Sequence, residues 1–147
     1  MKVLIQIVSN ASVSVDNKVV SSIENGYLLF VGIEKGDDDI TIEKMANKII
    51  NIRINKDEND KTNLSIMQTG GKILSISQFT LCADTKQRRP SFDKAANKDE
   101  AIRLYNLFNN KLRDNGLDVK EGVFGAYMKV DLQNDGPFTI FLDSTNL

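Results

Sequence analysis

The sequence predicts a single α/β domain with two long helices and about seven or eight strands. Alternating strand patterns fill the first and last thirds of the chain, and two internal stretches repeat apolar residues at helical spacing. No repeat, linker or low-complexity tract divides residues 1–147, which we therefore interpret as one domain. A chain of this length buries about 68–70% of its unfolded surface on folding, enough for one core.

The first third is predicted to be β-structure. Residues 3–8 form a strand, and residues 13–15 alternate apolar and polar side chains before a turn at residues 16–18. A hairpin with residues 19–20 follows from this pattern. Residues 27–33 are apolar on both faces, as in a strand covered on both sides.

The first helix is predicted near residues 39–52, where apolar residues recur at helical spacing. Three aspartates, Asp37, Asp38 and Asp39, precede it and can cap its positive end. The alternative, a metal cluster, is disfavoured because consecutive residues at a helix start point in different directions.

The second helix is predicted from Asn97 to Asn115. Asn97 is a suitable N-cap with Glu100 three residues later, and Gly116 is a suitable stop. Its inward face is expected to consist of four apolar or aromatic side chains: Ile102, Tyr105, Phe108 and Leu112.

The remaining strands are predicted at residues 64–67, 73–81 and 119–124, and around 128–132 and 138–142. A rigid Gly-Pro corner joins the last two. Residues 55–62 are expected to form a polar loop, and residues 83–96 an irregular segment.

Composition excludes several kinds of chemistry. The chain has no histidine, so a Ser-His-Asp or Cys-His nucleophile and an HExxH zinc site are impossible. The net charge of −1 gives no global attraction to nucleic acid. Cys82 is the only cysteine, and we interpret it as a small buried residue rather than a nucleophile. No metal or cofactor is expected.

The N-terminus is predicted to be a strand and not a signal peptide, because Gln6 interrupts its apolar run. No stretch approaches the ~20 apolar residues of a membrane span. We therefore expect a cytoplasmic protein.

Two short segments carry the candidate chemistry. Ser77, Gln78, Phe79 and Thr80 end a predicted strand, where free backbone N–H groups and polar side chains together could bind an oxyanion. Such a segment is also compatible with a strand whose polar residues face water. The Gly136-Pro137 step is often only a turn, and its isomer is not determined by sequence.

Together these segments resemble the D-aminoacyl-tRNA deacylase family. The similarity spans nearly the whole chain, and the motifs that carry it are Ala11-Ser12-Val13-Ser14-Val15, Gly32-Ile33-Glu34-Lys35, Ser77-Gln78-Phe79-Thr80-Leu81, Arg89-Pro90-Ser91-Phe92, Phe124-Gly125 through Met128, and Asn134-Asp135-Gly136-Pro137-Phe138-Thr139.

The resemblance implies a mostly antiparallel, barrel-like sheet and hydrolysis of D-aminoacyl-tRNA, and of glycyl-tRNA mischarged on tRNA-Ala. Hydrolysis would use backbone groups and the free hydroxyl of the terminal ribose. Ser77 to Thr80 would hold the aminoacyl-adenosine end, with Thr80 as a less favoured candidate nucleophile because no imidazole base is present.

The resemblance also implies a homodimer, in which a Gly-cisPro dipeptide reaches across a two-fold interface into the partner's pocket. Its carbonyls would bind the substrate amino group, so that an L side chain collides with the backbone. The residues expected to bind substrate are Gly136, Pro137, Phe124, Met128 and Asn134.

Lys86, Arg88 and Arg89 follow the first motif in an irregular segment, where cations could bind acceptor-stem phosphates. Ordinary surface solvation is the alternative for these three residues. Base-specific readout is not expected, because no aromatic cluster is interleaved with basic residues.

One position departs from the family pattern. Where many members have arginine, thought to brace the Gly-Pro loop, this chain has Ile7. A related branch carries a trans Gly-Pro bond and acts on L-alanyl-tRNA, which gives an alternative with relaxed chirality. A tRNA-end binding module without turnover is a third interpretation.

Overall fold

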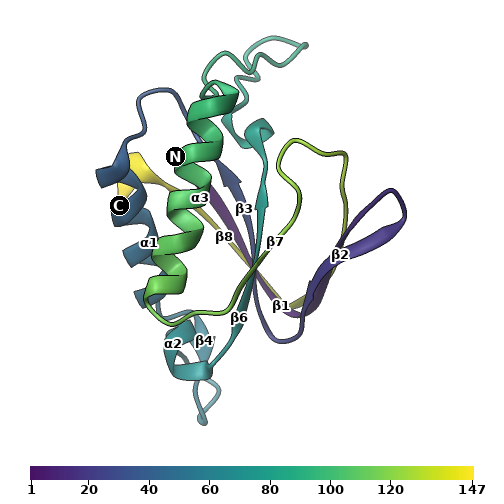
Figure 1. Ribbon diagram of the computed structural model, residues 1–147. Coiled ribbons are helices and arrows are strands. Elements are labelled where there is room, and N and C mark those ends of the chain that lie inside the picture. Colours follow the sequence, from purple (N-terminus) through teal and green to yellow (C-terminus); the bar gives the residue numbers. More distant parts are fainter.

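The computed structural model describes residues 1–147. It contains a six-stranded sheet, a small two-stranded sheet and three α-helices, of which α1 and α3 are long (Figure 1). The strands of the main sheet are β1 (Lys2–Val15), β2 (Lys18–Ile23), β3 (Gly26–Gly32), β6 (Lys72–Ser77), β7 (Val119–Glu121) and β8 (Lys129–Asp143).

The sheet is mixed and nearly closes on itself. Its order is β2-β1-β3-β6-β7, with β8 paired to the other edge of β1. The pairs β3·β6 and β6·β7 are parallel and the others antiparallel. The Ser21 hydroxyl of β2 donates a hydrogen bond to the Glu121 carbonyl of β7 at 2.5 Å, so the first and last strands of this order meet. The predicted barrel-like α/β fold is confirmed.

Two long helices cover one face of the sheet, α1 (Asp39–Asn51) and α3 (Lys98–Asp114). Figure 1 shows them side by side on the same side of the strands. Both helices have the predicted kind of N-cap. The Asp38 carboxylate accepts a hydrogen bond from the Thr41 N–H, and the Asn97 side chain accepts one from the Glu100 N–H. Both helix predictions are therefore confirmed.

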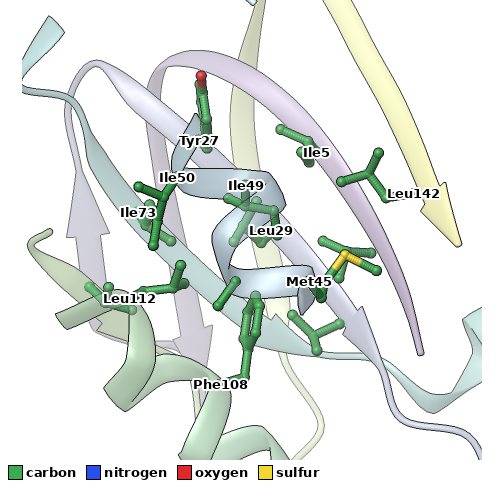
Figure 2. Packing of buried hydrophobic residues seen from close by; sticks show 14 of the residues in the cluster. Ile5, Tyr27, Leu29, Met45, Ile49, Ile50, Ile73, Phe108, Leu112 and Leu142 are labelled. Carbon is green, nitrogen blue, oxygen red and sulfur yellow. The ribbon is translucent and has the colours of Figure 1, made fainter. Parts of the chain in front are cut away.

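The main apolar core lies between these helices and the sheet (Figure 2). Helix α3 contributes Leu104, Tyr105, Phe108 and Leu112 to it. The prediction that Ile102 belongs to this face is wrong, since Ile102 is only half-buried and Leu104 takes the buried position. The apolar repeat alone did not distinguish these two side chains.

The three consecutive aspartates have three separate partners. Asp37 accepts from the terminal ammonium of Met1 at 2.6 Å, Asp38 caps α1, and Asp39 pairs with Arg103 at 2.8 Å. Their carboxylates thus point in different directions, as the capping interpretation expects.

The strand predicted at residues 64–67 is wrong. Strand β5 (Thr62–Leu64), paired with β4 (Asn55–Lys56), ends there, and a short helix α2 (Ile66–Thr69) follows. The Ser65 backbone N–H donates to the Gln68 side chain at 2.9 Å. Ser-x-x-Gln is a helix-start signal, and it outweighs a short apolar run.

Other strand boundaries also differ from the prediction. Strand β6 ends at Ser77, and a 3₁₀ helix η1 (Phe79–Cys82) replaces the predicted continuation. Strand β7 ends at Glu121, before Phe124. The first two predicted strands are one continuous strand, β1, and the last two are one strand, β8, with an irregularity at the Gly-Pro step. A second 3₁₀ turn, η2 (Ser144–Asn146), follows β8.

Candidate functional site

A cavity of about 280 Å³ opens where β6 ends. Its volume is near the lower end of the range for small-ligand sites, roughly 300–1,000 Å³. Eleven of its fifteen lining residues are apolar, which suits the flat face of a base or sugar better than a free charge. The lining includes six predicted site residues: Ser77, Gln78, Phe79, Thr80, Phe124 and Met128.

Gly32 makes room for the turn that forms one wall of the cavity. The Gln78 N–H donates to the Val31 carbonyl at 2.8 Å, which is the last bond before the chain turns into η1. A Cβ on Gly32 would lie 3.0 Å from the Cys82 sulfur and 3.2 Å from the Gln78 carbonyl. The turn therefore packs directly on glycine backbone.

The backbone N–H groups of this segment are not equally available. That of Gln78 is already used in the sheet, contrary to the simplest form of the oxyanion expectation. The first N–H groups of a helical turn have no partner inside the turn, which leaves those of Phe79 and Thr80 as candidates. Both residues are exposed and line the cavity.

The opposite wall is the loop between β7 and β8, visible as the long arc to the right of the sheet in Figure 1. Gly122 allows the loop to fold back, because a Cβ there would lie 2.7 Å from the Met128 sulfur. Phe124 packs against Tyr105 of α3 with ring centroids 5.8 Å apart. The Tyr105 hydroxyl donates to the Ser75 carbonyl at 2.8 Å, so this side chain connects the loop to strand β6.

Several residues of the cavity are not evident from local patterns. Phe30 and Val130 come from neighbouring strands, and Ala101 comes from α3. These residues meet only through the sheet order. Gly122 at the start of the loop and Gly125 in its middle were the available signal that this segment is irregular.

Cys82 lies behind the cavity and is fully buried. Burial raises the pKa of its thiol to about 11, with the Glu34 carboxylate adding to the effect. The prediction that Cys82 is a small buried residue is confirmed, and because only the thiolate is a competent nucleophile, its raised pKa agrees with the interpretation that it is not one.

The basic segment is an exposed loop that projects beyond the top of α3 in Figure 1. It carries Lys86, Arg88 and Arg89, all exposed, and two backbone bonds between Asp84 and Ser91 close its base. Hydrogen bonds from the Lys86 N–H and from Lys94 hold the pKa of the Asp84 carboxyl below its usual range. An edge-to-face contact between Phe79 and Phe92, at 5.2 Å, connects this loop to the cavity.

The Gly136-Pro137 step lies in a bulge of β8. Val8 of β1 pairs with Asn134 and Gln6 pairs with Thr139, so residues 135–137 are extra in β8. All three are exposed, and the Gly136-Pro137 peptide bond is cis, the isomer that the family resemblance implies.

The bulge does not meet the cavity within one chain. Thr139 lies opposite Gln6 on β1, which lies opposite Leu28 on β3. Ser77 lies opposite Val31, further along β3. Three strand spacings of about 4.8 Å and three residues of about 3.3 Å therefore separate Thr139 from Ser77. Gly136 lines a different cavity, of about 440 Å³.

The predicted substrate-binding role of Asn134 has a competing explanation in the structure. Its side-chain amide donates to the Thr139 hydroxyl at 2.9 Å, and its oxygen accepts from the Phe138 N–H at 3.1 Å. Both ends of the amide are thus used within the bulge.

The fold and the cavity together define a class: a histidine-free, barrel-like α/β domain with an apolar ligand site built at the carboxyl end of a strand. Comparison with known proteins then identifies the family. The sequence pattern of the family described as D-Tyr-tRNA(Tyr) deacylase matches residues 4–143, and the chain belongs to this family.

Curated relatives agree over the full length. A D-aminoacyl-tRNA deacylase from Listeria innocua is 50% identical over 100% of this chain and 99% of its own length. Another of that name, from Thermomicrobium roseum, is 52% identical over 100% of this chain and 96% of its own length.

Two solved structures are similar. One, described as a c-Myc DNA Unwinding Element Binding Protein, has a TM-score of 0.92 at 40% identity and covers 97% of this chain and 98% of its own. A second, described as a probable eukaryotic D-amino acid tRNA deacylase, has a TM-score of 0.83 over 96% of this chain and 97% of its own. At 18% identity it supports the fold alone. None of the helices of the present chain is long and apolar enough to cross a membrane.

Proposed function

We propose that this chain hydrolyses the ester bond of D-aminoacyl-tRNA. Water adds to the ester carbon, the ribose oxygen leaves as a hydroxyl, and the free D-amino acid and tRNA are released. The observation that carries the proposal is the apolar cavity that Ser77–Thr80 and Phe124–Met128 form together in a member of the deacylase family.

In this proposal the cavity holds the terminal adenosine and its ester. The apolar loop residues Phe124 and Met128 contact the nucleoside, and Ser77 and Gln78 supply polar contacts at the strand end. The N–H groups of Phe79 and Thr80 stabilise the oxyanion of the transition state. Because the chain has no histidine, the ribose hydroxyl beside the ester assists the attack of water.

We further propose that the active unit is a homodimer. Gly136 and Pro137 are exposed and remote from the cavity of their own chain, so a second copy can receive them. Their carbonyls would bind the substrate amino group. With amino group and ester both fixed, an L side chain meets rigid backbone, whereas a D side chain points away. Glycine has no side chain to collide with the backbone and is therefore not rejected, so mischarged glycyl-tRNA is a further expected substrate.

The exposed cations Lys86, Arg88 and Arg89 are proposed to contact acceptor-stem phosphates, next to the cavity that holds the tRNA end. Such contacts set affinity without reading sequence. Because its substrate is charged tRNA, we propose that the protein acts in the cytoplasm.

The test is release of tyrosine from D-tyrosyl-tRNA and L-tyrosyl-tRNA by the purified protein. Rapid release from the D ester alone supports the proposal. Equal rates on both esters, with activity on L-alanyl-tRNA, would instead favour the relaxed-chirality alternative. Tight binding of charged tRNA without release over hours would favour a binding module.

A further inference from the structure

The bulge of β8 has a narrow neck. It begins at Asn134, which pairs with Val8, and ends at Thr139, which pairs with Gln6. The residue of β1 between these two partners is Ile7, which faces the bulge with an apolar side chain. Residues 135–137 are exposed, so packing of their own side chains contributes little to their position.

One face of the neck is polar. The Thr139 hydroxyl oxygen accepts from the Asn134 amide at 2.9 Å and from the Gln6 amide at 3.2 Å. The Asn134 oxygen in turn accepts from the Phe138 N–H at 3.1 Å. These bonds connect both ends of the bulge to each other and to β1. We call Gln6, Asn134 and Thr139 the polar clamp.

The other face of the neck is apolar. Ile7 and Phe138 both pack against the main core, and both line the cavity beside Gly136. This packing holds Phe138, the residue before Thr139, whereas residues 135–137 are exposed and lack such packing. Beyond the backbone pairing of Asn134 and Thr139 with β1, the polar clamp is the side-chain contact that ties both ends of the bulge to this strand.

We propose that the polar clamp sets the orientation of Gly136 and Pro137, and thereby the chiral selectivity of the enzyme. This inference rests on the proposed deacylase function. The three side chains act as positioning residues: they touch the bulge and not the substrate. Asn134 thus changes from a substrate-binding candidate to a positioning residue.

The mechanism predicts a specific loss. If Gly136 and Pro137 can rotate, the wall that an L side chain meets is no longer fixed, while the cavity that holds the ester is unchanged. L-aminoacyl-tRNA is then hydrolysed more readily, and the D substrate is affected less. A merely structural role would lower both rates together.

The test compares Thr139→Val, which removes the accepting hydroxyl at nearly constant volume, with Thr139→Ser, which keeps it. Ser22→Val is the matched control, since Ser22 is exposed on β2, away from the bulge. Gln6→Met provides a second disruption should Thr139→Val fold poorly. Each variant is assayed on D-tyrosyl-tRNA and L-tyrosyl-tRNA.

We expect the ratio of L to D hydrolysis to rise about tenfold in Thr139→Val and less in Gln6→Met, as for the loss of one or two hydrogen bonds. Thr139→Ser, which keeps the hydroxyl, and Ser22→Val should both retain the wild-type ratio of L to D hydrolysis. An unchanged ratio in both disrupted variants would overturn the inference.

A second measurement does not depend on activity. Amide hydrogen exchange at Phe138 reports the bond to Asn134 directly. Asn134→Ala and Thr139→Val should speed exchange at this amide and leave core amides unchanged. If wild type releases no D-tyrosine, the proposed function fails, while exchange still decides whether the clamp holds the bulge; unaltered exchange in both variants would refute it.

Discussion

Gly136 has a φ of +138°, and a Cβ on it would lie 2.9 Å from the Phe138 nitrogen. L side chains rarely adopt this backbone conformation. The glycine type is therefore required by the bulge itself, before any substrate is considered. The backbone geometry and the proposed binding role therefore both require glycine at position 136.

Gly136→Ala should lower hydrolysis of D-tyrosyl-tRNA by about tenfold or more, because the strained residue shifts the carbonyls that we propose bind the amino group. The strained backbone should also lower the free energy of unfolding by about 1–3 kcal/mol, so activity is compared well below the melting temperature of the variant. Asp135→Ala, in the same bulge, serves as the control and should retain activity. Full activity in Gly136→Ala would contradict the proposed contact.

Cys82 allows a prediction about pH. Burial raises the pKa of its thiol to about 11, above the ordinary value of 9.0. A group whose folded-state pKa is raised contributes stability that is complete below the unfolded pKa and is lost as pH rises. The free energy of unfolding should therefore fall between about pH 9 and pH 11, and Cys82→Ala should flatten this fall.

Denaturant titrations of both proteins across this range would measure the effect. Alkylation of the native thiol at pH 8 should also be slow compared with that of the unfolded chain. Rapid native alkylation would show that Cys82 is more accessible than its burial indicates.

At the scale of elements, the turn after β6 depends on its neighbour β3. Gly32→Ala would bring a Cβ to 3.0 Å from the Cys82 sulfur and 3.1 Å from the Leu81 Cβ, so η1 must move outward. We expect the free energy of unfolding to fall by about 1–3 kcal/mol and the substrate to bind the altered cavity less tightly. Gly36→Ala is a control for glycine replacement, because its Cβ would meet nothing within 4 Å, although its φ of +90° adds backbone strain.

The measurements are the free energy of unfolding and the KM for D-tyrosyl-tRNA. An increase in KM for Gly32→Ala but not for Gly36→Ala would support the role of Gly32 in shaping the site. Equal effects of the two variants would mean that stability alone explains the change.

Elements with strong local signals were predictable from sequence. Asp38 and Asn97 cap the two long helices, and their apolar periodicity left little ambiguity. Elements that depend on distant residues were not. The turn at Phe79–Cys82 packs closely on Gly32 of β3, and no pattern within the segment itself encodes that contact.

The site was predictable only in part for the same reason. The two motifs were visible as sequence, but their separation depends on register: Gln6 pairs with Thr139, while Ser77 pairs with Val31. Register is set by the whole sheet and by its bulges. The hydrogen bonds among Gln6, Asn134 and Thr139 emerge only once this register is known.

At the scale of the whole molecule, the proposed homodimer, in which each cavity receives the bulge of the other chain, predicts complementation between two defective chains. Gly136→Ala damages the bulge, and Gln78→Ala damages the cavity. In a mixed dimer, one cavity is intact and receives an intact bulge from the other chain, so one site of two is active.

Co-refolding equal amounts of the two variants should restore about a quarter of wild-type activity, because half of the dimers are mixed and each has one working site. Mixing without refolding should restore less, if exchange of subunits is slow. No recovery, or a monomeric mass in solution, would contradict shared sites.

Strand β1 contributes to both apolar clusters of the protein. Its first half supplies Val3 and Ile5 to the cluster beneath the helices, and its second half supplies Val8, Ala11 and Val13 to the cluster on the other face. Neither cluster can lose its order while this strand keeps its place in the other. The chain should consequently melt as one cooperative unit, with equal calorimetric and van't Hoff enthalpies.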